Sequence, residues 1–346
     1  MTPGVVVNTR SIGSLLSGVQ RYTIELQHYL SDLTRPIAPR QLLGGIAGHA
    51  WEQFALPRFA GRQLLWSPAN TGPLSVKHQV LTIHDVASLD HPEWFNARFA
   101  AWYRWLIPRL VCSVHHIITV SEFSRQRLIE VARVREDHLS VVPNGVNSRF
   151  FSSSYEEAER VRLNMRIPSP SYLLGVGSFE PRKNLNRLLQ AWREASEHLP
   201  SDVWLVLAGR RGLSHVFRDA GFAIPARTYL AGFVPDSDLP GLYRGALAFV
   251  YPSLYEGFGL PVLEAMAAGN AVITSNNTAM PEIVEGAGLM VDPYDVGAIG
   301  DAIIRIVEDP ALRINLRSRA PLRARNYSWS RSAAATRSIL ESAMRQ

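Results

Sequence analysis

The sequence predicts an α/β protein of two domains, each built on a parallel β-sheet. Three observations predict this fold class. The 346 residues exceed what one compact core normally holds. Short strand-like runs alternate with helical stretches along the whole chain, as expected when helices connect parallel strands. A polar, charged stretch at 152–170, ending in Pro170, separates the two halves and is the best candidate for a linker.

In the first half, strands are predicted where apolar runs are bounded by turn residues. These strands are Val5–Asn8, Leu64–Ser67, Gln79–His84, His116–Val120 and Ser140–Pro143. Helices are predicted between them at 18–33, 95–111 and 121–131. Ser121 followed by Ser124 is typical of a helix start.

The second half starts a new series of strands. They are predicted at Tyr172–Gly177, Val203–Ala208, Thr228–Ala231, Ala248–Tyr251, Ala271–Thr274 and Leu289–Val291. A helix follows the first of them, with Asn184 as its expected cap and apolar residues at i, i+3, i+4 and i+7. Two such domains in tandem leave a cleft between them, and ligands of open parallel sheets bind at the carboxyl ends of the strands.

Composition excludes several classes of protein. With 47% apolar and 19% charged residues the chain has the balance of a globular protein. The single cysteine, Cys112, rules out an intrachain disulfide framework and fits a cytosolic location; its apolar surroundings predict a buried structural thiol. The start has no signal-peptide pattern, and no apolar run approaches the length of a membrane span. We expect a cytoplasmic protein, soluble or peripheral at a membrane.

The net charge of +6 is unevenly distributed. Residues 1–150 carry 15 basic and 10 acidic residues, a balance of +5, whereas 151–325 carry 18 and 19. The basic half is suited to contact with anionic lipid or a phosphorylated acceptor. Base composition is an equally good explanation, because 34 of the 36 basic residues are arginine. No aromatic–basic pattern or zinc finger indicates nucleic-acid binding.

The most informative motif is EGFGLPVLEAMAAG at 256–269, which follows a strand and opens a helix. Seven residues separate Glu256 from Glu264. Glycine at 259 lets the backbone approach a ligand closely, and the amides of Phe258, Gly259 and Leu260 at the helix start suit an anion. A solvated glutamate pair on a plain strand–turn–helix is the alternative, but the complete string favours a functional site.

A second motif, GSFEPRKN at 177–184, follows the first strand of this domain. Gly177 and Ser178 offer backbone donors, while Arg182 and Lys183 place two cations beside a helix start. Fixed cations stabilise a leaving diphosphate as its charge develops. Two surface cations of no function are the alternative, although the helix dipole disfavours them there.

Weaker signals lie at other strand ends. Gly209 and Val234 follow two strands of the second half, and Gly18 opens the first helix of the chain, where a glycine permits close approach of phosphate. His84 ends a strand and is expected to donate to a sugar hydroxyl or bind at the reacting centre. The D-x-D string at 236–238 is interpreted as a helix cap and not as a metal site, so no metal ligand is expected.

These motifs resemble those of the family 4 retaining glycosyltransferases, which have the GT-B fold. The resemblance covers nearly the whole chain and is weakest in its N-terminal third. It implies two Rossmann-like domains, at 1–160 for the acceptor and 161–325 for the donor, facing each other across a cleft. It further implies a last helix, at 326–346, that crosses back onto the N-terminal domain.

The resemblance also implies roles for the site residues. Glu256 contacts the transferred sugar, Glu264 holds the ribose hydroxyls, and Arg182 with Lys183 binds the pyrophosphate. The backbone from Phe258 to Leu260 meets sugar and phosphate. Gly177, Ser178, Gly209, Val234 and Gly18 belong to the donor site, and His84 is the active-site histidine.

The stretch from Thr82 to Phe95 resembles the O-antigen mannosyl- and rhamnosyltransferases that use GDP-sugars. The resemblance therefore implies hexose transfer from a nucleotide-sugar co-substrate, without metal or other cofactor, to a lipid-linked saccharide. A UDP-sugar donor and a non-catalytic sugar-nucleotide-binding protein stay open as alternatives. A dinucleotide-dependent oxidoreductase fits less well, since the third glycine of its fingerprint is missing and Gly209 stands where a ribose-binding acid is needed.

Overall fold

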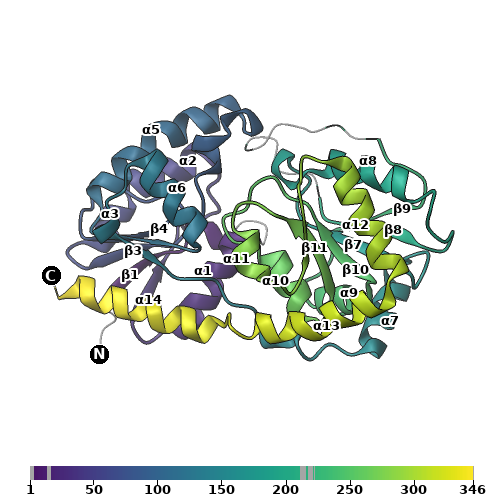
Figure 1. Cartoon of the computed structure of the whole chain (residues 1–346). Helices are drawn as coiled ribbons and strands as arrows, with labels where there is room; N and C mark the ends of the chain where they lie inside the picture. The colour runs from purple at the N-terminus through teal and green to yellow at the C-terminus, as the bar shows by residue number, and fades with distance from the viewer. Residues whose placement is uncertain (1–3, 14–16, 211–215, 217–220, 222, 346) are drawn as a thin grey trace. The chain divides into compact units, whose positions relative to one another are not determined.

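The computed structural model describes residues 4–13, 17–210, 216, 221 and 223–345. The chain divides into two compact units: Met1–Gly145 with Tyr327–Gln346 forms the first, and Val146–Asn326 forms the second. Figure 1 shows a sheet flanked by helices in each unit. Among the described residues, no helix is both long and apolar enough to cross a membrane.

The first unit is built on a six-stranded parallel sheet of order β2-β1-β3-β4-β5-β6. Its strands are β1 (Val5–Asn8), β2 (Thr34–Ile37), β3 (Leu64–Ser67), β4 (Gln79–Thr82), β5 (His116–Thr119) and β6 (Leu139–Val141). Its main helices are α1 (Gly18–Tyr29), α2 (Gly45–Phe54), α3 (Leu56–Ala60), α4 (Ala87–Asp90), α5 (Ala97–Ser113), α6 (Glu122–Ala132) and α14 (Trp329–Met344). Short 3-10 turns η1 (Arg10–Gly13), η2 (Pro92–Trp94) and η3 (Glu136–His138) join them.

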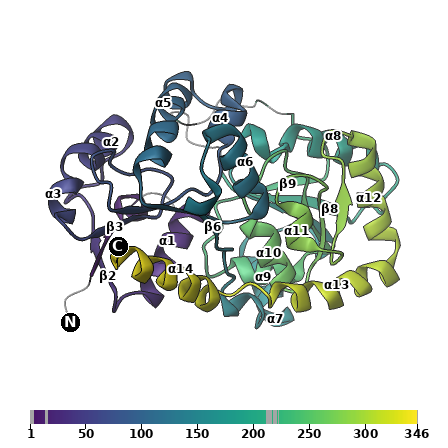
Figure 2. The ribbon, with the colours of Figure 1, turned by 60° about the vertical axis from the view of Figure 1, so that its left-hand side comes forward.

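Helices cover both faces of this sheet. On one face, Leu81 and Ile117 pack with Leu106 and Leu128 of α5 and α6. On the other face, Trp66 makes an edge-to-face contact with Tyr22 of α1. The C-terminal helix α14 packs against α1 and β3, so the predicted return of the last helix to the first domain is confirmed (Figure 2).

The second unit has a six-stranded parallel sheet of order β12-β11-β10-β7-β8-β9. Its strands are β7 (Tyr172–Val176), β8 (Trp204–Ala208), β9 (Thr228–Gly232), β10 (Ala248–Tyr251), β11 (Ala271–Ser275) and β12 (Leu289–Val291). Its helices are α7 (Tyr155–Asn164), α8 (Leu185–Ala195), α9 (Leu239–Gly245), α10 (Leu260–Ala267), α11 (Met280–Val284), α12 (Val296–Glu308) and α13 (Pro310–Ala324), with 3-10 turns η4 (Ser148–Phe150) and η5 (Pro181–Lys183).

Strand β10 shows that helices cover both faces of this sheet. Ala248 and Val250 point into the core that α8 and α12 cover. Because side chains alternate along a strand, Phe249 and Tyr251 point the opposite way, where Phe249 meets Tyr243 of α9. The strand order changes direction between the central strands β7 and β10. Ligands of such sheets bind at this switch point, at the carboxyl ends of the strands.

Two expectations are wrong. The stretch 152–170 is no linker, because helix α7 lies within it and packs against α9, and the unit boundary falls at Gly145 and not at 160. Strand β2 is an addition to the predicted strands, and its Pro36 is tolerated because β2 lies at the edge of the sheet. Cys112 is exposed, because it lies on the outer face of the amphipathic helix α5.

Candidate functional site

The two principal motifs meet at the carboxyl ends of β7 and β10. Backbone and side-chain hydrogen bonds join the loops that follow these strands: the amide of Leu254 donates to the carbonyl oxygen of Arg182 at 2.8 Å, and Ser253 Oγ lies 2.9 Å from the same oxygen. The side-chain amide of Asn184 donates to the carbonyl oxygens of Pro252 and Pro293, at 2.9 and 2.6 Å. The arrangement fixes Arg182 and Lys183 beside Glu256.

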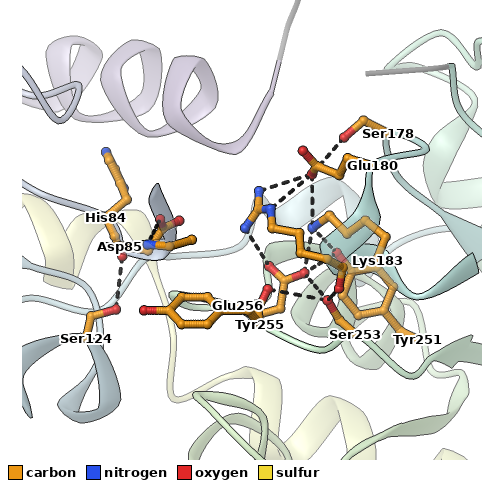
Figure 3. A network of polar contacts seen from close by, with 12 residues as sticks. His84, Asp85, Ser124, Ser178, Glu180, Lys183, Tyr251, Ser253, Tyr255 and Glu256 are labelled. Atoms are coloured by element: carbon orange, nitrogen blue, oxygen red, sulfur yellow. Dashed lines mark hydrogen bonds and ion pairs between the residues drawn. The ribbon is translucent and has the colours of Figure 1, made fainter. Parts of the chain in front are cut away.

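Glu256 is the centre of a buried polar cluster (Figure 3). Its Oε1 atom lies 2.5 Å from Lys183 Nζ, 2.8 Å from the Tyr251 hydroxyl and 2.8 Å from Ser253 Oγ. Lys183 also donates to the Tyr251 hydroxyl at 2.5 Å. Lys183 and Tyr251 therefore donate to one carboxylate oxygen, and the single hydroxyl proton of Ser253 serves either this oxygen or the carbonyl oxygen of Arg182. Arg182 Nη1 lies 3.8 Å from the other carboxylate oxygen.

Charges and burial act in opposite directions on this cluster. Burial by itself raises the pKa of Glu256, but the charges of Lys183 and Arg182 outweigh it and hold the pKa below the ordinary value. Burial raises the pKa of Tyr251 well above its usual range, and the neighbouring Glu256 adds to the rise. At neutral pH the cluster thus contains a carboxylate and a neutral phenol.

A second carboxylate, Glu180, pairs with the same cations. Its side chain is 2% exposed, and Oε1 accepts from Ser178 Oγ at 3.0 Å. Arg182 Nε donates to this oxygen at 3.2 Å, Arg182 Nη2 forms an ion pair with it at 3.2 Å, and Lys183 Nζ lies 3.9 Å away. The two cations therefore lie between two buried carboxylates, Glu180 and Glu256.

The start of α10 brings the second predicted glutamate close to the loop. Gly259 is the N-cap residue, with φ of +100°, a value that favours glycine. Phe258 and Leu260 on either side of it are buried. Glu264 lies one turn into the helix, where its Oε2 accepts from the Tyr243 hydroxyl at 3.2 Å. Backbone amides and a buried carboxylate thus lie along one helix end.

Two predicted glycines are required by the backbone next to this cluster. Gly177 and Gly209 have φ values of +151° and +154°. A Cβ on Gly209 would lie 1.8 Å from the carbonyl oxygen of Gly177, so only glycine fits. Val234, in the loop after β9, is buried. The structure places Gly209 against the loop that carries the cations.

The first unit contains the other two predicted residues, His84 and Gly18. His84 follows β4 and is buried, with Nε2 2.8 Å from the carbonyl oxygen of Pro68. Since a carbonyl only accepts, Nε2 carries the proton of the neutral ring. Burial lowers the pKa of His84, which keeps the ring neutral. With Nε2 directed at Pro68, Nδ1 is the acceptor of the neutral ring, and a role of His84 at the reacting centre stays a prediction.

Gly18 is the first residue of α1, as predicted for a glycine at a helix start. Ser17 before it forms a capping box with Gln20, which satisfies backbone groups at this end. The preceding residues 14–16 lie outside the described part of the chain.

The D-x-D string takes part in ion pairs. Asp236 pairs with Arg149, and Asp238 lies 4.0 Å from Arg160. Asp238 occupies the N-cap position of α9, as expected, but its side chain makes no capping hydrogen bond. Within the described residues, no three His, Cys, Asp or Glu side chains gather as a metal site.

Sequence reasoning missed Glu180, Tyr251 and Ser253 as members of the cluster. Each lies at or just after the carboxyl end of a predicted central strand, and that placement was the available signal. Asn184 was expected to cap α8; it has the left-handed conformation, with φ of +60°, and its side chain instead joins two loops.

Comparison with known proteins identifies relatives of this chain. A sequence profile described as glycosyl transferases group 1 matches residues 163–323, and one described as glycosyltransferase family 4 matches residues 49–150. The O-antigen chain mannosyltransferase B of Escherichia coli is 35% identical over 264 residues, which cover 74% of this chain and 68% of that protein. The serotype-specific mannosyltransferase WbdA of Escherichia coli is 31% identical over 224 residues, 63% of this chain but 27% of that protein.

Among solved structures, HepE of Anabaena in complex with UDP-glucose superposes with a TM-score of 0.76. The match covers 97% of this chain and 99% of that one, at 16% identity. At this identity the likeness concerns the fold.

Proposed function

Since the chain belongs to the family 4 glycosyltransferases and has their GT-B fold, we propose that it transfers a mannose or rhamnose residue from a GDP-linked donor, with retention of anomeric configuration. Glycosyltransferase activity follows from the family. Mannose is supported by relatives named as mannosyltransferases, one of them an O-antigen chain mannosyltransferase. A UDP-sugar donor is the alternative, and HepE, which has this fold, is a protein solved with UDP-glucose.

The observation that carries the proposal is the pairing of Arg182 and Lys183 with Glu256 at the switch point of the second sheet. A nucleoside diphosphate leaving group needs cations fixed in advance, because they stabilise charge that grows in the transition state. The amides at the start of α10 add donors for an anion. Glu264, buried one turn further, is suited to the ribose hydroxyls.

Glu256 is proposed to orient the sugar and not to attack it. Lys183 and Tyr251 donate to Oε1, Ser253 Oγ lies beside it, and two cations stabilise the charged carboxylate. A donor phosphate oxygen takes the proton of the acceptor hydroxyl as the hydroxyl enters on the face that the phosphate leaves. This route needs neither a protein base nor a metal ion or other cofactor.

The acceptor is proposed to be a lipid-linked oligosaccharide or polysaccharide at the cytoplasmic face of the membrane. A relative named as an O-antigen chain mannosyltransferase supports this class. Helix α5 supports a peripheral contact with anionic lipid: it contains no acidic residue and exposes Arg98, Arg104 and Arg109. Trp105 is 43% exposed on the same helix, with the Arg109 guanidinium over its ring.

Incubation with labelled GDP-mannose, GDP-rhamnose and UDP-glucose tests the proposal. Transfer to a lipid-linked acceptor, or slow hydrolysis without one, is expected for a GDP-sugar. Proton NMR of the product then gives the anomeric configuration, and an inverted product contradicts retention. Binding without transfer or hydrolysis indicates a non-catalytic sugar-nucleotide-binding protein.

A further inference from the structure

Glu180 lies in the loop between β7 and η5, which backbone hydrogen bonds hold at several points. The amide of Phe179 donates to Arg210 O at 2.7 Å, and the amide of Lys183 donates to Glu180 O at 3.0 Å. The side chain is 2% exposed, so a bound ligand does not reach it without movement of the loop. Any effect of Glu180 on the reaction therefore passes through its neighbours.

The two carboxylates divide the two cations between them. Glu256 takes Lys183 at 2.5 Å, whereas Glu180 takes one edge of the Arg182 guanidinium, through Nε and Nη2 at 3.2 Å. The third nitrogen, Nη1, is 3.8 Å from Glu256 Oε2. A guanidinium is a rigid planar fork, so contact along one edge fixes the direction of the whole group.

Without this contact, Arg182 would be drawn toward Glu256. A charge pair at 3.8 Å can shorten to a direct hydrogen bond, and the lost contact restores rotamer freedom to a long side chain. The arginine would then neutralise a protein carboxylate and no longer point its donors at a ligand.

The other oxygen of Glu180 shows that stability alone does not explain this residue. Oε2 is buried and has no hydrogen-bond partner among the residues that the structure describes. A buried polar atom left unpaired lowers the free energy of unfolding. The unpaired oxygen of the Glu180 carboxylate therefore makes the folded protein less stable.

We propose that Glu180 is a positioning residue that holds the Arg182 guanidinium in the direction needed by the leaving diphosphate. The inference rests on the proposed function, in which Arg182 and Lys183 bind that diphosphate. Glu180 acts through Arg182 and touches neither donor nor acceptor. Its effect belongs to the transition state, because fixed direction matters most where charge is developing.

Kinetics of GDP-mannose hydrolysis or transfer test the proposal. Glu180→Gln keeps the volume but removes the charge, and we expect kcat to fall about ten- to a hundredfold. KM for GDP-mannose is expected to change less than about threefold, since the loss is confined to the transition state. The thermal midpoint should stay unchanged or rise. Glu197→Gln, an exposed glutamate of the same unit, is the matched control.

A double-mutant cycle separates positioning from a structural role. Adding Glu180→Ala to Arg182→Ala should lower kcat no further, because the group that Glu180 holds is already gone. An additive loss, or a fall in thermal midpoint that accounts for the lost activity of Glu180→Gln, overturns the proposal.

A second test needs no nucleotide-sugar. It measures hydrogen exchange of the Arg182 Nε–H by nitrogen-15 NMR, and the signal is assigned by its loss in Arg182→Lys. We expect the exchange to quicken at least about tenfold in Glu180→Ala, because a hydrogen bond is lost. An unchanged exchange rate would show that Glu180 does not restrain Arg182 and would overturn the proposal. If Arg182→Ala keeps full kcat, or the wild type does not act on GDP-mannose, the proposed function fails instead, while the exchange rate still decides the contact.

Discussion

Lys183 and Glu264 lie at opposite ends of the proposed donor site and are expected to act at different stages. Lys183 contacts Glu256 and the Tyr251 hydroxyl, next to the point where the leaving phosphate gains charge. Glu264 is buried one turn into α10, where it accepts from Tyr243. A cation at the leaving group favours the transition state, whereas a carboxylate at the ribose binds substrate and transition state alike.

Lys183→Ala should therefore lower kcat about a hundredfold or more, with a smaller effect on donor affinity. Glu264→Ala should weaken binding of the nucleoside diphosphate about tenfold or more, with a smaller effect on kcat. Steady-state kinetics and calorimetric titration measure the two effects. Lys77→Ala, at the only other lysine of the chain, is the control. A Lys183→Ala enzyme with an unchanged rate contradicts the assignment.

His84 gives the first unit a predicted dependence of stability on pH. Burial lowers its pKa, so the unfolded chain takes up a proton at a pH where the native chain does not. Stability should decrease as the pH falls below about 6.5, by at most about 1.4 kcal/mol per pH unit. Thermal midpoints at about pH 7.5 and about pH 5.5 measure this, and His84→Gln should lose less than the wild type. An equal loss in both proteins would sink the prediction.

The charged residues of the site could be predicted from the sequence, whereas their hydrogen-bond partners could not. Arg182, Lys183 and Glu256 lie in motifs at strand ends, and the structure brings them together. Tyr251 and Ser253 gave no comparable signal, because a tyrosine ending a strand and a serine in a turn are common. Their roles depend on a hydrogen-bond geometry that only the folded loops create.

At the scale of elements, the loop after β7 depends on a glycine of the neighbouring strand. Gly209 follows β8, and its backbone lies directly against the carbonyl of Gly177. Gly209 N–H in turn donates to Gly232 O at 2.7 Å, which connects the loop after β9. Three consecutive strand ends are thus joined by close backbone contacts.

Gly209→Ala should displace the loop that carries Arg182 and Lys183, because the added Cβ would lie 1.8 Å from Gly177 O at a φ of +154°. We expect a loss of about 2 kcal/mol or more in stability, with weaker nucleotide binding. Thermal shift with and without GDP measures both. Gly44→Ala, where nothing lies within 4 Å of the added Cβ, should change neither. Equal behaviour of the two variants would argue against the contact.

Most strands were predictable and several helices were not, for physical reasons. Buried parallel strands are short, continuous apolar runs, and β1, β3, β10 and β12 have the predicted bounds. Helix α7 has few apolar residues, so its sequence resembles a linker; only packing against α9 reveals its two buried positions, Ala158 and Val161. Strand β2 contains a proline and depends on its neighbour β1.

At the scale of the whole molecule, each unit has its own sheet and its own core, but the first is not continuous in sequence. Its last helix, α14, arrives after the entire second unit. Trp329 at the start of α14 is 3% exposed and makes an edge contact with Tyr22. The backbone of Trp329 leaves no room for a side chain at Gly145, where a Cβ would lie 2.1 Å from its amide nitrogen.

Truncation after Asn326 should consequently unfold or aggregate the first unit, since it uncovers Tyr22 and Trp66. The second unit retains all its strands and the complete cluster around Glu256, so a fragment of residues 146–326 should still bind GDP. Circular dichroism and calorimetric titration of the two proteins test this. A truncated chain with the full stability of the wild type would show that α14 is dispensable.

The most direct test of the central claim is a crystal structure of the protein with GDP, or with UDP if only UDP binds. The account predicts the terminal phosphate within hydrogen-bond distance of Arg182 and Lys183, and the ribose hydroxyls at Glu264. A nucleotide bound away from the carboxyl ends of β7 and β10, with both cations still paired only to Glu180 and Glu256, would contradict it.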